Sequence, residues 1–162
     1  MEIIDWESFP KNRKGHDALV NQLLELIKSK YHLRCLEFDE KEAAIAERHG
    51  QRPRYYVAHK PDLIIADEQR LESRIFIEYV NTPRSYLRDL RGMLALSTLI
   101  KHYKGFVLAI RHSIFPRIWS TALSLEIPVE IMSLKSLLFA LDKQDLDYLV
   151  GKRGSLNGNS RA

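Results

Sequence analysis

Two short apolar segments constrain the fold more than any other part of the chain. They are PDLIIAD (61–67) and RIFIEYV (74–80), and the largely polar EQRLES between them predicts two neighbouring strands joined by a turn. Period-two alternation places Phe76, Glu78 and Val80 on one face of the second strand. Both faces are otherwise apolar, which is typical of a central strand covered on both sides. A lone carboxylate there costs several kcal/mol, so Glu78 requires a partner.

Two kinds of partner satisfy Glu78. An arginine or lysine would form a structural ion pair, whereas a second acid would share a divalent cation with it, and Asp62 on the preceding strand is the obvious candidate. Two carboxylates on adjacent strands suit Mg²⁺ or Mn²⁺, which prefer hard oxygen ligands. Such a cation activates water and polarises a phosphodiester, as hydrolysis of a nucleic-acid backbone requires.

The remaining periodicity predicts one α/β domain over residues 1–150, with a mixed central β-sheet flanked by helices. The tail 151–162 is basic, lacks apolar periodicity and is expected to be flexible. Helices are expected at 16–30, 40–50, 84–103, 116–125, 133–141 and shortly before Gly151, and further strands at 32–38, 54–59, 106–110 and 128–132.

Several classes of protein are excluded by what the sequence lacks. A doubly wound nucleotide-binding fold competes with this architecture, but no glycine-rich phosphate loop follows any predicted strand. The single cysteine, Cys35, rules out an internal disulfide and a zinc ribbon. No apolar stretch is long enough to cross a bilayer, and the acidic N-terminus is unlike a signal peptide, so the expected location is the cytoplasm.

The arrangement of Pro61, Asp62 and Glu78, with a long helix after the second strand, resembles the PD-(D/E)XK nuclease superfamily over roughly residues 14–110. The resemblance implies a restriction-endonuclease-like core, in the order helix, three strands, helix, strand (α-β-β-β-α-β), with C-terminal additions. Size, basic character and the RKG before the first helix are most similar to archaeal Holliday-junction resolvases and related archaeal or viral nucleases. The implied activity is that of a metal-dependent DNA endonuclease, and the likeness to junction resolvases implies specificity for DNA structures such as junctions or recombination and repair intermediates.

By this resemblance Asp62 and Glu78 are metal ligands and the backbone carbonyl of Tyr79 is a third. The lysine of the motif belongs at position 80, where this chain has valine. Three explanations compete. Lys60, two residues before Asp62, supplies the catalytic amine; Asn81 orients the water; or hydrolysis has been lost and a nuclease-like DNA-binding protein remains.

Basic residues gather around the proposed site, although the formal net charge is only +4. This distribution favours a polyanion such as DNA, and RNA stays open as the alternative. Arg84 stands within one turn of the metal strand, where a guanidinium can hold a phosphate. The residues expected to contact nucleic acid are Lys14, Arg52, Arg54, Arg84 and Arg88.

The superfamily's first helix often carries a further acid, and Asp17 is the nearest match, with His16 beside it. The helix macrodipole alone favours an acid in a first turn, so both residues are secondary candidates. The resemblance also implies a homodimer. A third reading, in which Glu78 pairs with an arginine in a scaffold unrelated to nucleic acid, stays open beside the nuclease and the inactive DNA binder.

Overall fold

The chain forms a five-stranded mixed sheet and a separate two-stranded sheet. In this computed structural model, residues 4–49, 52–122 and 127–151 are described, with only the backbone for 47–49, 52–55 and 119–122. The main sheet has the order β1-β4-β5-β6-β7, antiparallel from β1 to β5 and parallel from β5 to β7. Its strands are β1 (Arg34–Cys35), β4 (Leu63–Ala66), β5 (Ile75–Val80), β6 (Gly105–Ile110) and β7 (Val129–Ser133).

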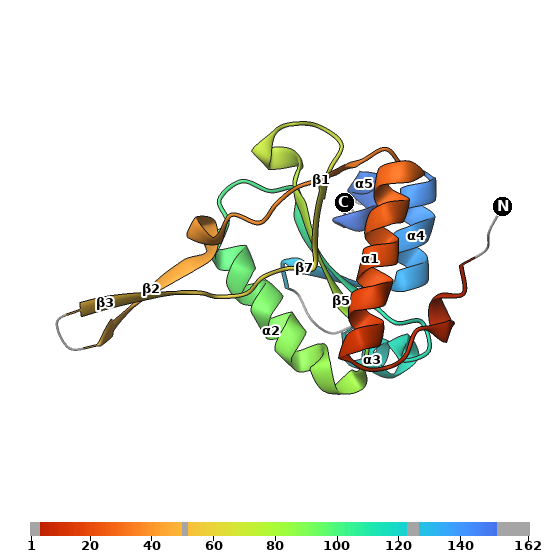
Figure 1. Ribbon diagram of the computed structural model, residues 1–162, viewed down its shortest axis with the longest axis horizontal. Helices are drawn as coiled ribbons and strands as arrows, with labels where there is room; N and C mark the ends of the chain where they lie inside the picture. Colours follow the sequence, from red (N-terminus) through yellow and green to blue (C-terminus); the bar gives the residue numbers. More distant parts are fainter. Residues whose placement is uncertain (1–3, 50–51, 123–126, 152–162) are drawn as a thin grey trace, which may run out of the picture.

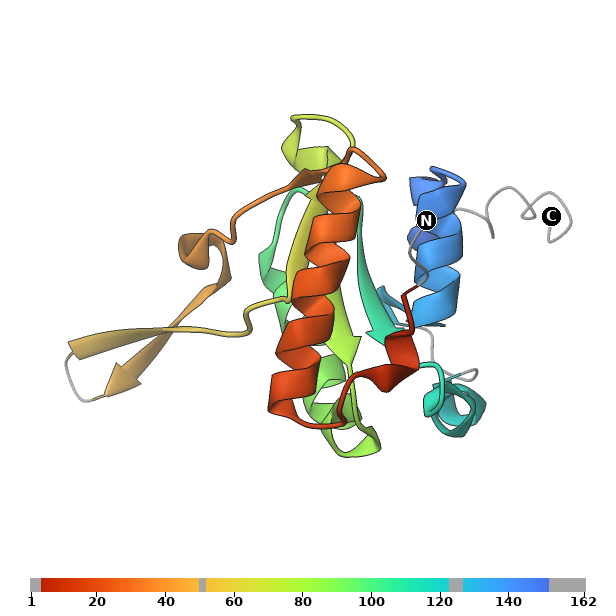
Figure 2. The ribbon, with the colours of Figure 1, turned by 45° about the vertical axis from the view of Figure 1, so that its right-hand side comes forward.

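Helices cover both faces of this sheet (Figure 1). On one face lie α1, α4 and α5, and on the other lie α2 and α3. In Figure 2, α1 lies in front of the sheet and α2 lies behind it. The helices are α1 (Arg13–Ser29), α2 (Pro83–Leu99), α3 (Phe115–Ala122), α4 (Leu134–Asp142) and α5 (Leu146–Leu149), with 3₁₀ turns η1 (Trp6–Ser8), η2 (Glu40–Ala43) and η3 (Leu71–Ser73).

The central strand β5 confirms the alternation predicted from sequence. Its residues Ile75, Ile77 and Tyr79 lie in the core beneath α1, α4 and α5. Phe76 and Val80 lie in the core beneath α2. Every residue of β5 is buried, so the mixed α/β architecture with helices on both faces is confirmed, and Glu78 stands inside it as a carboxyl group that is 5% exposed.

The predicted helix over 40–50 is wrong. Only Glu40–Ala43 is helical, as the 3₁₀ turn η2, and β2 (Ala44–His49) follows it and pairs with β3 (Arg52–Val57) in an antiparallel hairpin. Alanine and glutamate favour helices locally, but the cross-strand pairs with the β-prone segment that follows override that preference. The hairpin projects away from the main sheet (Figure 1).

Several element boundaries also differ from the sequence-based expectation. The first helix begins at Arg13, three residues early, because Asn12 caps it by accepting a hydrogen bond from the Gly15 N–H. The long helix α2 ends at Leu99 rather than near Tyr103. Ser133 caps α4 as predicted, and the leucines of α4 and α5 pack into the core. The tail 152–162 lies outside the described residues.

Among the described helices, none has the length and apolar character needed to cross a lipid bilayer.

A buried ion pair fastens the base of the hairpin to the main sheet. The guanidinium of Arg74 donates to both carboxylate oxygens of Glu42, at 2.6 and 2.9 Å, and also to the carbonyls of Leu71 and His102. Arg74 is 4% exposed, so this bidentate pair holds a charge that would otherwise be buried alone.

We expect Glu42→Ala to lower the free energy of unfolding by about 2 kcal/mol, because it leaves the Arg74 charge with carbonyl partners only. Urea unfolding measures the change. Glu68→Ala is the matched control, since its pair with Arg70 is exposed on both sides and contributes between about 0 and 1 kcal/mol. Equal losses in the two variants would contradict the assignment of Arg74–Glu42 as the anchor.

Candidate metal and nucleic-acid site

The proposed site residues meet in a cavity of about 520 Å³ at one end of the main sheet. β4 begins and β5 ends there, and the N-termini of α1 and α2 meet at the same place. The positive ends of two helix dipoles therefore flank the cavity. The residues lining it that the sequence had singled out are His16, Lys60, Asp62, Glu78, Asn81, Arg84 and Arg88.

Two hydrogen bonds connect Asp62 to the end of β5, one to Glu78 and one to Tyr79. The Asp62 N–H donates to Glu78 Oε1 at 3.0 Å, and the Tyr79 N–H donates to Asp62 Oδ2 at 2.8 Å. Each carboxyl group thus accepts from the backbone of the neighbouring strand, beyond the last pair of the β4–β5 ladder. The fold therefore brings together the two acids that the sequence paired.

The backbone carbonyl of Tyr79 points toward the β4 side of β5, where Asp62 lies. The Val80 carbonyl accepts from Arg111 N–H on the β6 side at 2.9 Å, and successive peptide groups of a strand point to opposite sides, so the Tyr79 carbonyl points toward β4. The register that pairs Leu63 with Ile77 puts Pro61 opposite Tyr79 when it is extended. Because proline has no N–H, it cannot donate to this carbonyl.

Glu78 is surrounded by conditions that favour its neutral form. Burial, followed by the charge of Asp62, raises the pKa of Glu78 well above the ordinary value of a glutamate. Nε2 of His59 lies 2.9 Å from Glu78 Oε2, but this buried nitrogen does not make a hydrogen bond. Burial lowers the pKa of His59. We interpret the contact as a neutral imidazole beside a neutral carboxyl group.

His16 connects Asp62 to a second acid. Its Nε2 lies 3.1 Å from Asp62 Oδ2, and its Nδ1 lies 3.0 Å from Asp17 Oδ1. The hydrogen bond to Asp62 is the largest of the effects that raise the pKa of His16 to about 9. Asp17 is exposed and also contacts Arg13, so it contributes to the site by holding His16.

Sequence reasoning missed two residues of the site, His59 and Asp89. Asp89 is 5% exposed, on the buried side of α2, and burial raises its pKa. It follows buried Tyr86 by three residues, and an acid on the apolar stripe of a helix was the available signal. The imidazole of His59 packs against Gly92 of α2, where an added Cβ would lie 2.3 Å from Nδ1. Glycine within this helix therefore leaves room for His59.

The three groups weighed in place of the motif lysine have different surroundings. Val80 is fully buried in the core beneath α2. Lys60 lines the cavity but is exposed and forms no ion pair with a described residue. Asn81 donates to the carbonyls of Pro10 and Asn12 and accepts from Arg111, so its amide ties the start of α1 to the sheet.

The cavity has an acidic floor and a basic rim. The side chains of Asp62, Glu78 and Asp89 are at most 17% exposed, whereas that of Arg88 is 74% exposed. The exposed cations of the rim are Lys11, Arg13, Lys60, Arg84 and Arg88. Lys14 is exposed outside the lining, and Arg52 and Arg54 lie on β3 of the hairpin, where the structure describes the backbone alone.

Within the described ranges, no group of three or more histidine, cysteine, aspartate or glutamate side chains has the arrangement of a metal site. No arginine or lysine in those ranges forms an ion pair with Glu78, whose close side-chain contact is with His59. Comparison with protein-family models, with curated proteins and with solved structures found no significant match.

We expect the free energy of unfolding, measured in chelator, to fall as pH rises from about 6.5 to about 9. The folded pKa of His16 is raised to about 9, so its stabilising contribution is complete below about 6.5, the unfolded value, and is lost as pH rises through 9. Glu78 acts in the same direction, because its raised pKa keeps a proton that the unfolded chain releases.

Urea unfolding over this pH range tests the expectation. Asp62→Asn is the informative variant, since it removes a charge that contributes to raising both pKa values, and it should make the profile less steep. A wild-type profile that is flat, or that rises with pH, would contradict the description of His16 and Glu78.

Proposed function

We propose that this protein is a metal-dependent nuclease that hydrolyses phosphodiester bonds in DNA, with a core like that of the PD-(D/E)XK superfamily. The observation that carries the proposal is the Asp62–Glu78 pair, joined across β4 and β5 on the floor of a cavity with a basic rim. Acids on the floor suit a cation, and arginines on the rim suit the phosphates of a polyanion.

The order of elements supports the proposal. Without the β2–β3 hairpin, the chain runs α1, β1, β4, β5, α2, β6, which is the helix, three strands, helix, strand order of the superfamily. The antiparallel β1-β4-β5 unit followed by parallel β6 is compatible with that core. In this interpretation the hairpin is an insertion, and β7, α4 and α5 are additions after the core.

The oxygen atoms present fit Mg²⁺ or Mn²⁺. Asp62, Glu78 and the Tyr79 carbonyl would hold the cation, with water and substrate phosphate completing its shell, which is how Mg²⁺ is commonly bound when few side chains reach it. When bound, the cation would supply charge for a phosphodiester and for an attacking water. The proton that Glu78 retains must leave first, so binding is expected to release protons.

Basic groups of this chain lie close to the two acids despite Val80. Nε2 of His16 is 3.1 Å from Asp62, and Nε2 of His59 is 2.9 Å from Glu78. Either imidazole, or the amine of Lys60 at the rim, would orient a water at the carboxylates. Arg84 and Arg88 would hold neighbouring phosphates.

A specific observation favours a second candidate, a DNA-binding protein without hydrolysis. Val80 is fully buried against α2, so an amine at this position is absent and the space is filled by core packing. The binder would retain DNA in chelator and give no cut product with any divalent cation.

We expect Asp62→Asn and Glu78→Gln each to reduce Mn²⁺-dependent cleavage of DNA by at least about a hundredfold, because each removes an anionic oxygen from the cation. Gel assays with duplex, single-stranded and junction DNA, and with RNA, measure the loss. Asp67→Asn is the matched control, an exposed acid just beyond the other end of β4. Full activity in Asp62→Asn would exclude this site, and uncut DNA that still binds wild-type protein would favour the binder.

We expect Arg84→Ala to weaken DNA binding for all sequences and to reduce the slope of log affinity against log salt by about 1, because one phosphate contact is lost. Fluorescence anisotropy at a series of salt concentrations measures the slope. Arg34→Ala is the control, an exposed arginine on β1 that lines neither this cavity nor its rim. An unchanged slope in Arg84→Ala would remove this residue from the interface.

A further inference from the structure

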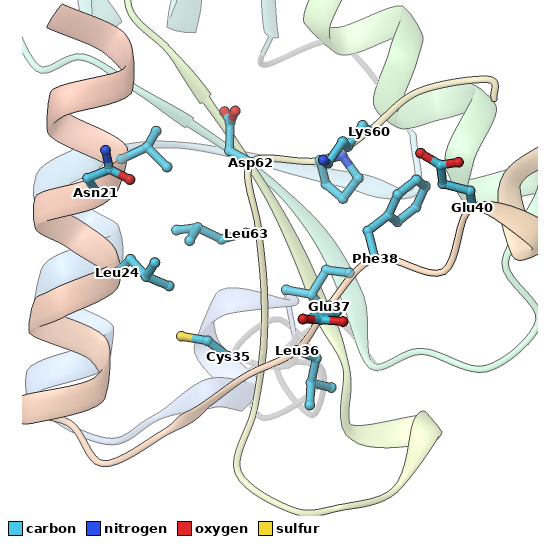
Figure 3. A pocket seen from close by; sticks show the side chains of 13 residues that line it. Asn21, Leu24, Cys35, Leu36, Glu37, Phe38, Glu40, Lys60, Asp62 and Leu63 are labelled. Carbon is cyan, nitrogen blue, oxygen red and sulfur yellow. The ribbon is translucent and has the colours of Figure 1, made fainter.

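A second cavity of about 460 Å³ lies beside the proposed site, between α1 and the chain that follows β1. Figure 3 shows Asn21 and Leu24 of α1 on one side, Phe38 on the other, and Leu63 between them, with Asp62 at one end. Lys60 and Asp62 line both cavities. The two cavities therefore adjoin at Lys60 and at Asp62, one of the proposed metal ligands.

The chemistry of this second cavity differs from that of the first. Leu24 and Phe38 are half-buried apolar side chains, and the nearby acids are Glu37 and Glu40, both exposed. Lys60 is the only basic residue in its lining among the described residues. Carboxylates at the mouth repel a phosphate, while they and the Asn21 amide can accept hydrogen bonds from amino groups.

We propose that this second cavity binds one unpaired nucleobase of the nucleic acid whose phosphates lie in the first cavity. The inference rests on the proposed function and adds a requirement for an unstacked nucleotide next to the cleaved bond. A nucleobase has the flat apolar faces that Phe38 can stack on and edges that Asn21 and Glu37 can bond. The anionic phosphates of the backbone suit the positive charges on the rim of the first cavity. An uncharged base suits the second cavity, which has apolar walls and exposed glutamates.

A base inside a duplex is stacked and paired, so it cannot enter such a cavity without being extruded. The preferred substrates are therefore single strands, or duplexes with unpaired nucleotides at an end, a loop or a branch. Acceptors at the mouth also favour bases that carry an exocyclic amino group, which adenine, cytosine and guanine have and thymine lacks.

An abasic scan tests the inference. The full chain is titrated, in chelator and at low salt, against labelled single strands that each carry one abasic site at a different position. We expect one position to lower affinity about tenfold, the size of one base–aromatic stack. In Phe38→Ala, affinity for the intact strand should fall about tenfold and the same abasic site should then have an effect of no more than about twofold.

Phe139→Ala is the matched control, because this phenylalanine is 58% exposed on α4 and lines neither cavity. It should keep the position-dependent loss. Asn21→Trp tests the same cavity if Phe38→Ala does not fold, since Asn21 is exposed and a larger side chain fills the space without removing a core contact. It should also abolish the abasic effect.

The failures of the two proposals are distinguishable. Strands that bind tightly with the same affinity at every abasic position would overturn the nucleobase cavity and leave the nuclease proposal standing. An abasic effect that survives in Phe38→Ala or in Asn21→Trp would also overturn the nucleobase cavity without affecting the nuclease proposal. Strands that do not bind at all would overturn the nucleobase cavity, and the gel assays with duplex and junction DNA would then test the nuclease proposal separately.

Discussion

The structure depends on a carboxyl group held inside a sheet. Glu78 lies on the central strand β5, between helices on both faces, and its oxygens are reached by the backbone of Asp62 and by His59. Removing an ionised carboxyl group from water costs free energy, and for this reason burial raises the pKa of Glu78. The neighbouring elements reduce this cost by presenting an N–H group and the N-termini of α1 and α2 at the same end of the sheet.

The residues at the ends of β4 and β5 hold the two acids in position. Pro61 has no N–H and so cannot donate to the Tyr79 carbonyl, while the Tyr79 N–H donates to Asp62. Asn81 and Arg111 fasten the segment before α1 to the end of β5, and this holds His16 against Asp62. Asp62 also lines the second cavity. The proposed cation site and the proposed nucleobase site therefore lie next to each other.

The sequence was sufficient for the features that follow from local periodicity. The strands of 61–67 and 74–80, their pairing and the faces of β5 were predictable, since apolar alternation and a short polar connection dictate them. The helix expected at 40–50 failed because cross-strand pairing with 52–57 outweighs helix propensity. His59 and Asp89 were missed because only the tertiary fold brings them to the site. His59 packs against Gly92 of α2, and Asp89 lies on the buried side of that helix in the lining of the same cavity.

The central claim is that Asp62 and Glu78 hold a divalent cation, and calorimetric titration of Mn²⁺ into the wild-type chain tests it most directly. Repeating the titration in buffers of different ionisation enthalpy counts the protons released. The account predicts one saturable site per chain, with proton release at neutral pH because Glu78 and His16 hold protons in the metal-free protein. Absence of saturable binding, or binding that is unchanged in a double Asp62→Asn, Glu78→Gln variant, would contradict it.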